Sequence, residues 1–190
     1  MTQNESGWRI DYSYLDEIQK GSGIELASCY QCRKCSNGCP VSFAMDLRPE
    51  ELVKLILMGD RERVENSHTI WVCASCQTCL TRCPNDVDIP RLADYLKESF
   101  LAKGGRPPEP KTALLHKVFL KDIGKRGRIF EGGMMANFYL KSGDLSVSKM
   151  MDNAKLGLSM FKKGRMALTP SGIKAKNEIK QIFKELGGDK

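Results

Sequence analysis

All eight cysteines of this 190-residue chain lie between Cys29 and Cys83, in two runs of one pattern. The first run reads Cys29-Tyr-Gln-Cys32-Arg-Lys-Cys35-Ser-Asn-Gly-Cys39-Pro40, and the second reads Cys73-Ala-Ser-Cys76-Gln-Thr-Cys79-Leu-Thr-Arg-Cys83-Pro84. Three thiolates separated by two-residue gaps can each bind a different iron of one 4Fe-4S cubane, and the fourth iron then needs a thiolate from elsewhere. The doubled CxxCxxCxxxCP run therefore predicts two 4Fe-4S clusters.

The fourth cysteine of each run is expected to serve the cluster of the other run, as in the two-cluster ferredoxin pattern. The proline that follows it helps to turn the chain away from the site. One cluster is thus assigned to Cys29, Cys32, Cys35 and Cys83, and the other to Cys73, Cys76, Cys79 and Cys39. This crossed ligation would make the two sites depend on each other.

Structural zinc is the main alternative use of these cysteines. Zinc sites usually take two separated CxxC pairs, whereas here a third cysteine follows at the same short gap in both runs, for which tetrahedral coordination gives no reason. Disulfides fit less well still, because reducing compartments do not sustain them. Residues 1–7 are polar and no apolar stretch follows, so no signal peptide is predicted and a cytoplasmic location is expected.

The segment between the two runs has a helical pattern. Pro49 stands at a first helical position, apolar residues recur through Leu57, and Gly59 ends the helix. A second short helix is expected at residues 60–65. A small βαβ ferredoxin would need a hairpin with alternating β-branched residues, which we do not find. The fold class predicted is mainly α, an α-helical ferredoxin domain with a helical C-terminal extension.

Helices are also predicted on both sides of the cysteine runs. Before the first run, Ser13 caps a helix to Lys20 that Gly21 closes. After the second run, Asp88 caps and Pro90 opens a helix with one apolar face. That face consists of Ile89, Leu92, Ala93, Leu96 and Phe100. It is expected to pack against the cluster region and to shield it from water.

Charge is divided unevenly along the chain. Residues 1–102 carry 11 Lys and Arg against 15 Asp and Glu, whereas residues 103–190 carry 19 against 8. Segment 104–110 contains three prolines and two glycines, which cannot continue a helix. We therefore expect a domain with two 4Fe-4S clusters at residues 1–103, a linker at 104–110 and a basic helical extension at 111–190.

The basic extension is predicted to contain helices at residues 112–120, 145–162 and 171–186, with Ser171 as a cap and Gly187 after the last turn. The Gly/Arg-rich segment 124–133 is expected to be irregular. The extension is rich in methionine: Met134, Met135, Met150, Met151, Met160 and Met166. Methionine suits both an adaptable docking surface and ordinary core filling. The linker and the charge asymmetry favour docking of partner subunits over core filling. Nucleic-acid binding is disfavoured, because no groove-reading motif accompanies the basic residues.

No side chains stand at a spacing typical of bond-making chemistry. His68 and His116 are isolated, and Gly21-Ser22-Gly23 lacks the third glycine of a dinucleotide fingerprint. Tyr30 and Trp71 are candidates for shielding a cluster, although simple packing explains them as well. The longest apolar runs, such as residues 55–58, are far shorter than the roughly 20 residues that span a bilayer. We therefore expect no catalytic residue, no flavin or nicotinamide site and no membrane segment.

The doubled CxxCxxCxxxCP motif, the helical spacer and the short chain resemble the C subunit of soluble heterodisulfide reductases, with the motif region at about residues 25–102. The resemblance implies an electron relay from a flavin-containing A subunit, through two 4Fe-4S clusters, to a B subunit that reduces the coenzyme M–coenzyme B mixed disulfide in methanogenesis. A hydrogenase or a formate dehydrogenase can belong to the larger assembly. The B subunit's signature includes a doubled cysteine followed by glycine, and this chain has no adjacent cysteine pair.

Two other functions stay open from the sequence. The same cluster domain occurs in iron-sulfur subunits that resemble those of succinate dehydrogenase, fumarate reductase or glycolate oxidase. Those subunits usually carry an extra ferredoxin domain or a catalytic cysteine repeat, and neither pattern is found here. A different class is a non-enzymatic metal-cluster protein that binds nucleic acid through its basic tail.

Overall fold

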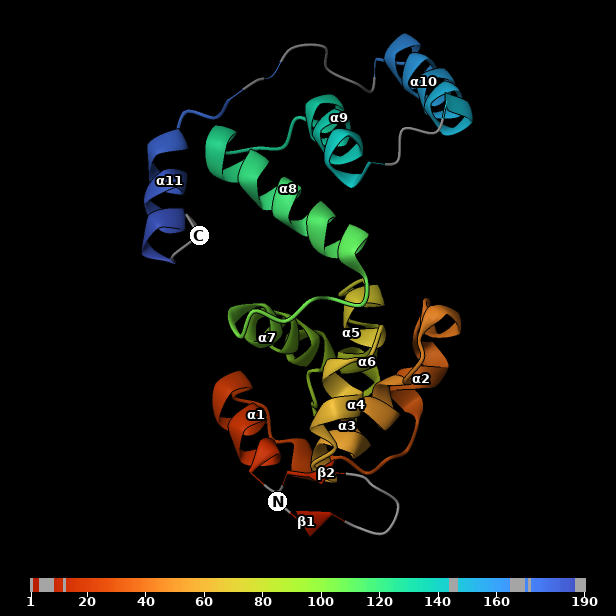
Figure 1. Cartoon of the computed structure of the whole chain (residues 1–190), viewed down its shortest axis with the longest axis vertical. Helices are drawn as coiled ribbons and strands as arrows, with labels where there is room; N and C mark the ends of the chain where they lie inside the picture. Colours follow the sequence, from red (N-terminus) through yellow and green to blue (C-terminus); the bar gives the residue numbers. More distant parts are fainter. Residues whose placement is uncertain are drawn as a thin grey trace. The chain divides into compact units, whose positions relative to one another are not determined.

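The computed structural model describes residues 2–3, 9–11, 13–143, 147–164, 170 and 172–186, and helices dominate this part of the chain (Figure 1). Its strands are one antiparallel pair of two residues each, β1 (Thr2–Gln3) and β2 (Arg9–Ile10). The chain divides into two compact units, Met1–Pro110 and Lys111–Lys190. The predicted mainly α fold is thus confirmed.

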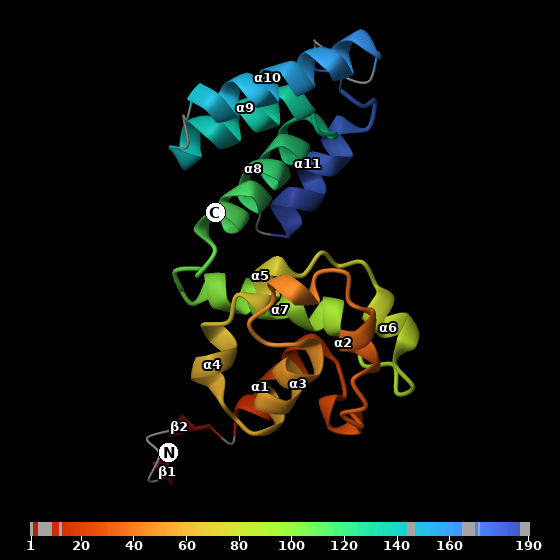
Figure 2. The same ribbon diagram turned by 90° about the vertical axis from the view of Figure 1, so that its right-hand side faces the viewer.

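Apart from α7, the helices of the first unit are shorter than those of the second (Figure 2). Around the cysteines lie α1 (Tyr14–Ser22), η1 (Leu26–Ser28), α2 (Lys34–Gly38), η2 (Ser42–Ala44), α3 (Pro49–Leu57), α4 (Arg61–Glu65), α5 (Thr69–Val72), α6 (Thr78–Arg82) and α7 (Ile89–Ala102). Beyond them follow α8 (Pro110–Arg126), α9 (Glu131–Ser142), α10 (Val147–Lys162) and α11 (Lys176–Glu185).

The core of the first unit lies where α1 packs against both α3 and α7. Apolar residues at helical spacing on each helix fill it, so that water is excluded from their shared face. The fully buried side chains include Tyr14, Ile18, Leu52, Val53, Ile56 and Leu92. Four of the five residues predicted for the apolar face of α7 are buried, and the fifth, Phe100, is half-buried and meets Trp71 edge-on, with ring centroids 6.3 Å apart.

Several helix ends follow the local rules that predicted them. α3 begins at Pro49, and Gly59 follows its end with φ +72°. The carboxylates of Asp60 and Asp88 cap α4 and α7, accepting hydrogen bonds from the backbone N–H of Arg63 (3.1 Å) and Arg91 (3.0 Å).

The end predicted for α1 is wrong. The helix continues through Gly21 to Ser22, and Gly23, with φ +69°, is its C-cap. Gly21 lies against the phenol ring of Tyr95, where a Cβ would overlap the ring. Its lack of a side chain therefore serves close packing of α1 on α7. Ser13 precedes the helix, but its side chain forms no cap and its Oγ donates to Asp11 Oδ1 at 2.6 Å.

The second unit is more helical than the sequence predicted. α8 extends beyond the predicted 112–120, and of the segment expected to be irregular only residues 127–130 lie outside α8 and α9. Gly124 stays helical because it faces Phe183 of α11, only 3.1 Å from where a Cβ would lie. Gly127 ends α8 with φ +80°. Ser171 and Gly187, the predicted cap and stop of the last helix, lie outside the described residues, as does Met166.

An ion-pair network joins three helices of the first unit. The guanidinium of Arg61 lies 2.9 Å from Asp11, 2.5 Å from Glu17 and 3.3 Å from Glu65, and it stacks 4.4 Å above the Tyr14 ring. Lys103, just after α7, also contacts Glu17 (2.9 Å) and Glu65 (3.4 Å). The hydrogen bond from Arg61 is the main cause that lowers the pKa of Glu17. The network therefore ties α1, α4 and the end of α7 together.

Candidate metal centre

The two cysteine runs fold in the same way. In each, two non-glycine residues adopt positive φ: Gln31 (54°) and Arg33 (63°) in the first, Ser75 (50°) and Gln77 (64°) in the second. Such conformations are unfavourable for non-glycine residues, by about 1–3 kcal/mol where they are strained, and they cluster at ligand-binding sites. Their occurrence at matching positions shows that the spacing of the cysteines imposes one backbone path on both runs.

A short helix follows each loop and carries the third cysteine of its run. α2 carries Cys35 and α6 carries Cys79, and the fourth cysteines, Cys39 and Cys83, are the C-cap residues of these helices with extended backbones. The two helices pack against each other. Gly38 makes this possible, because a Cβ at that position would overlap the side chain of Arg82, its counterpart in the second run. The packing brings the end of each run toward the start of the other.

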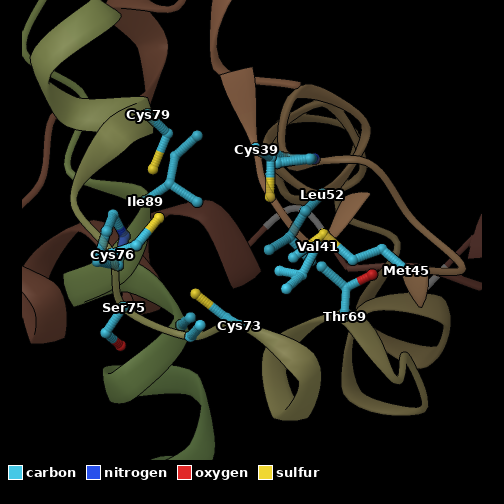
Figure 3. Close-up of a pocket in the computed structure, with 14 residues that line it drawn as sticks. Cys39, Val41, Met45, Leu52, Thr69, Cys73, Ser75, Cys76, Cys79 and Ile89 are labelled. Carbon is cyan, nitrogen blue, oxygen red and sulfur yellow. The ribbon is translucent and has the colours of Figure 1, made fainter. Parts of the chain in front are cut away.

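Four cysteine sulfurs from both runs line one pocket. Cys73, Cys76 and Cys79 of the second run share it with Cys39 of the first. The pocket encloses about 440 Å³, including space open to solvent. Figure 3 shows the four sulfurs directed into a common space. The rest of its wall is largely apolar and includes Val41, Met45, Pro49, Leu52, Ile89 and Ala93.

The other four cysteines line a second pocket of about 370 Å³, also partly open. Cys29, Cys32 and Cys35 share this pocket with Cys83. Its wall is more polar and includes Arg33, Lys34, Glu50 and Asn85. The structure thus gathers the predicted site residues into the same two sets that the crossed assignment names.

All eight cysteines are free thiols, so no disulfide competes for the sulfurs. Within the described residues, no three Cys, His, Asp or Glu side chains lie close enough to hold a single metal ion. Four soft thiolates around a pocket with room for several atoms are the donor set of an iron-sulfur cluster. The residues present therefore fit a 4Fe-4S group in each pocket.

The thiols differ in how readily they lose a proton. Burial raises the pKa of Cys79 to about 12, and the negative charges of Cys73 and Cys35 add to the rise. Burial is also the main cause that raises the pKa of Cys35, against hydrogen bonds from Ser36. The exposed Cys76 has a lowered pKa because it is hydrogen-bonded to Thr78. Since metals bind thiolates, cluster assembly would have to displace the protons of the buried Cys79 and the half-buried Cys35.

Hydrogen-bond donors surround the sulfurs unequally. In the first set, Gln31 Nε2 and the backbone N–H of Val87 donate to the sulfurs of Cys29 and Cys83, each at 3.3 Å. In the second set, the Cys76 thiol donates to Thr78 Oγ1 at 3.4 Å. Hydrogen bonds to cluster sulfurs favour the more negative, reduced state. The polar pocket thus has more such donors than the apolar one.

Asp46, which the sequence analysis did not single out, holds the start of α5 in place. Its carboxylate accepts hydrogen bonds from Ser67 Oγ (2.8 Å), His68 N (3.0 Å), Thr69 N (3.0 Å) and Thr69 Oγ1 (2.8 Å). Burial acts to raise the pKa of Asp46, but these hydrogen bonds together outweigh it and lower the pKa to about 2. α5 leads directly into Cys73, so Asp46 positions the first cysteine of the second run.

The aromatic and histidine residues noted in the sequence take different places. Trp71 is buried in the core, whereas Tyr30 is 73% exposed at the rim of the polar pocket. His68 pairs through Nδ1 with Glu109 Oε1 at 2.7 Å, and His116 lies in α8. In the part of the chain that the structure describes, neither histidine lines either pocket. No described helix is long and apolar enough to cross a membrane.

Comparison with known proteins agrees with this geometry. Residues 25–87 match the family described as the 4Fe-4S dicluster domain. The chain is 28% identical over 164 residues to the C2 subunit of the H2/formate:CoB-CoM heterodisulfide,ferredoxin reductase of Methanococcus maripaludis, a match covering 86% of this chain and 76% of that protein.

Two further relatives match over a shorter length. The identity is 34% over 103 residues to an iron-sulfur C subunit of the CoB–CoM heterodisulfide reductase of Methanocaldococcus jannaschii, covering 50% of this chain and 55% of the relative. It is 29% over 98 residues to the C subunit of the H2:CoB-CoM heterodisulfide,ferredoxin reductase of Methanothermobacter marburgensis, covering 49% and 53%. The chain thus spans about half the length of these two relatives. Residues 25–87 thus match the 4Fe-4S dicluster domain, and the chain is similar to heterodisulfide reductase C subunits.

Proposed function

We propose that this chain is the electron-relay subunit of a heterodisulfide reductase complex. The observation that carries the proposal is the pair of pockets that are each lined by four cysteines drawn from both runs. The names of the relatives support it, because each is a C subunit of such a reductase.

The proposed ligands are Cys29, Cys32, Cys35 and Cys83 for the first 4Fe-4S cluster, and Cys73, Cys76, Cys79 and Cys39 for the second. When bound, the two clusters supply one-electron carriers. The chain's own part is to hold them side by side. Cys35 and Cys79, one from each proposed site, lie on α2 and α6, which pack against each other.

The chain would act between two partner subunits. We propose that a flavin-containing A subunit delivers electrons and that a B subunit uses them to reduce the coenzyme M–coenzyme B disulfide, in a cytoplasmic assembly to which a hydrogenase or a formate dehydrogenase can be attached. The disulfide-cleaving site is assigned to the B subunit, because its signature includes a doubled cysteine and this chain contains no adjacent cysteine pair.

The second unit is proposed as the docking element for these partners. Among its described side chains only Val118 is a buried hydrophobic residue, while Leu140, Leu156 and Leu186 are 71%, 60% and 81% exposed. Exposed apolar side chains in a basic helical segment favour association with another protein surface. This is the role expected for the extension at residues 111–190.

The test is anaerobic purification of the chain from its own cells, followed by reduction of the isolated complex. We expect a flavoprotein and a protein with a Cys-Cys-Gly signature to co-purify, and the mixed disulfide to reoxidise the reduced clusters of this chain. Reoxidation by fumarate or by a quinone, with no response to the mixed disulfide, would instead favour the succinate- or glycolate-type alternative. Failure of every one of these oxidants would refute the relay.

A further inference from the structure

A buried carboxylate lies beside the first cluster site and has no counterpart at the second. Glu50 is only 4% exposed and lines the pocket of Cys29, Cys32, Cys35 and Cys83. Among the described residues, no acidic side chain lines the other pocket. The internal repeat explains the difference: Ser36 and Arg33, the partners of Glu50, correspond to Leu80 and Gln77 in the second run.

The carboxylate of Glu50 has a hydrogen-bond partner and a charged partner from the first run. Ser36 Oγ donates a hydrogen bond to Oε2, and the guanidinium of Arg33 lies 3.9 Å from Oε1. Glu50 is also the second residue of α3, where the helix N-terminus favours a negative charge. Arg33 is 70% exposed, so solvent screens its charge more strongly than that of the buried carboxylate. Lys34, the other cation of this wall, is exposed as well, so the Glu50 carboxylate is the least solvent-screened charge beside the first site.

We propose that Glu50 lowers the reduction potential of the cluster bound by Cys29, Cys32, Cys35 and Cys83 relative to that of the other cluster. The inference rests on the proposed ligation. Reduction adds one electron to a cluster whose thiolates already make it negative, so a fixed negative charge nearby disfavours that step. Through this charge, Glu50 biases the single electron shared by the two sites toward the apolar pocket, in opposition to the hydrogen bonds from Gln31 and Val87, which favour reduction of the first site. No bond is broken and no proton is transferred in this step.

The test is a redox titration of the anaerobic full-length protein with dithionite and mediators, followed by EPR. Cys76→Ser alters a proposed ligand of the second site only. The reduction step that changes in this variant therefore belongs to the cluster of the second site. Glu50→Gln preserves the side-chain size and an acceptor for Ser36. It is expected to raise the potential of the first site and to shift the distribution of one electron between the sites by a factor of ten or more, equivalent to about 59 mV for one electron.

Two controls make the result specific. Glu51→Gln removes a carboxylate charge from the next position of α3. Glutamine can still accept the hydrogen bond that Glu51 Oε2 receives from Arg48 N (2.8 Å). This variant should leave the reduction potentials of both clusters unchanged. Arg33→Gln copies the residue found at the matching position of the second run and should shift the first step in the opposite direction. This variant carries the test if Glu50→Gln does not retain its clusters.

The outcomes separate this inference from the proposed function. An unmodified protein without iron and sulfide would remove the proposed ligation itself. If both clusters are present, two results would overturn only the role of Glu50. One is that Glu50→Gln shifts the reduction potentials no more than Glu51→Gln does. The other is that Glu50→Gln shifts the potentials of both clusters equally. A first reduction step that moves to higher potential in Arg33→Gln would overturn that role as well, because loss of the cation beside Glu50 leaves the carboxylate charge less neutralised.

Discussion

Crossed ligation makes a quantitative prediction about paired cysteine substitutions. Cys39 lines the pocket of the second run and is absent from the wall of the first. Its backbone N–H bonds to Ser36 O at 3.2 Å, which alanine preserves, so Cys39→Ala should change a ligand and little else. Iron should fall from about eight to about four atoms per chain, because one of two four-iron clusters is lost.

Double substitutions show which cluster has been lost. If Cys39 and Cys76 serve the same cluster, Cys39→Ala with Cys76→Ala should also leave about four iron atoms, because the second change removes a ligand from a site already lost. Cys39→Ala with Cys32→Ala should leave almost none, because each change destroys a different site.

The assay is iron and acid-labile sulfide per chain after anaerobic reconstitution, with EPR of the reduced protein to confirm the cluster type. The reverse pattern would refute the crossing: about four iron atoms retained when Cys39 and Cys32 are replaced together, and almost none when Cys39 and Cys76 are replaced. Cys83→Ala provides the matched experiment from the other run, with Cys32 and Cys76 exchanging their roles.

Three further predictions concern the scaffold. Truncation after Pro110, the boundary between the compact units, should leave about eight iron atoms per chain but reduce co-purification of partner subunits, and full partner stoichiometry would contradict the docking role. Arg61→Met should lower the free energy of unfolding by about 2 kcal/mol, measured as a lower guanidinium midpoint for loss of the cluster absorbance. Lys103→Met should lower it by about 1 kcal/mol or less, because the Lys103 side chain is more exposed. Equal effects of the two variants would argue against Arg61 as the centre of the network. Asp46→Ala should destabilise by about 1–2 kcal/mol at neutral pH. The folded-state pKa of Asp46, about 2, lies below its ordinary value of 3.8, so its contribution to stability is complete above pH 3.8 and is lost as the pH falls through about 2. The free energies of unfolding of the variant and the unmodified protein, measured in urea on the metal-free chain, should therefore converge near that pH. A difference that stays constant with pH would be evidence against a role of the carboxylate.

Local rules predicted the elements around the cysteines well. Pro49 and Asp88 act within one helical turn of themselves, so the starts of α3 and α7 follow from the sequence. The cysteine spacing is equally local, since it determines which three sulfurs of each loop point toward the same site. The grouping of the fourth cysteine needed a known pattern, because it depends on how α2 and α6 pack.

Tertiary packing determines two features that local sequence rules did not predict: where helices continue through glycines, and which acidic residue of α3 is buried. Gly21 and Gly124 look like helix breakers, yet Tyr95 and Phe183 occupy the space that their missing side chains leave, and the helices continue. Glu50 and its neighbour Glu51 look alike in the sequence. Only the packing of α3 against α2 buries the first beside the cysteines and leaves the second in solvent.

The most direct measurement is the iron and sulfide content of the native protein, purified anaerobically without reconstitution and examined by Mössbauer spectroscopy. We predict about eight irons and eight sulfides per chain, all in 4Fe-4S form. A folded, colourless preparation with two zinc ions, or with no metal at all, would contradict the claim that the eight cysteines bind two 4Fe-4S clusters.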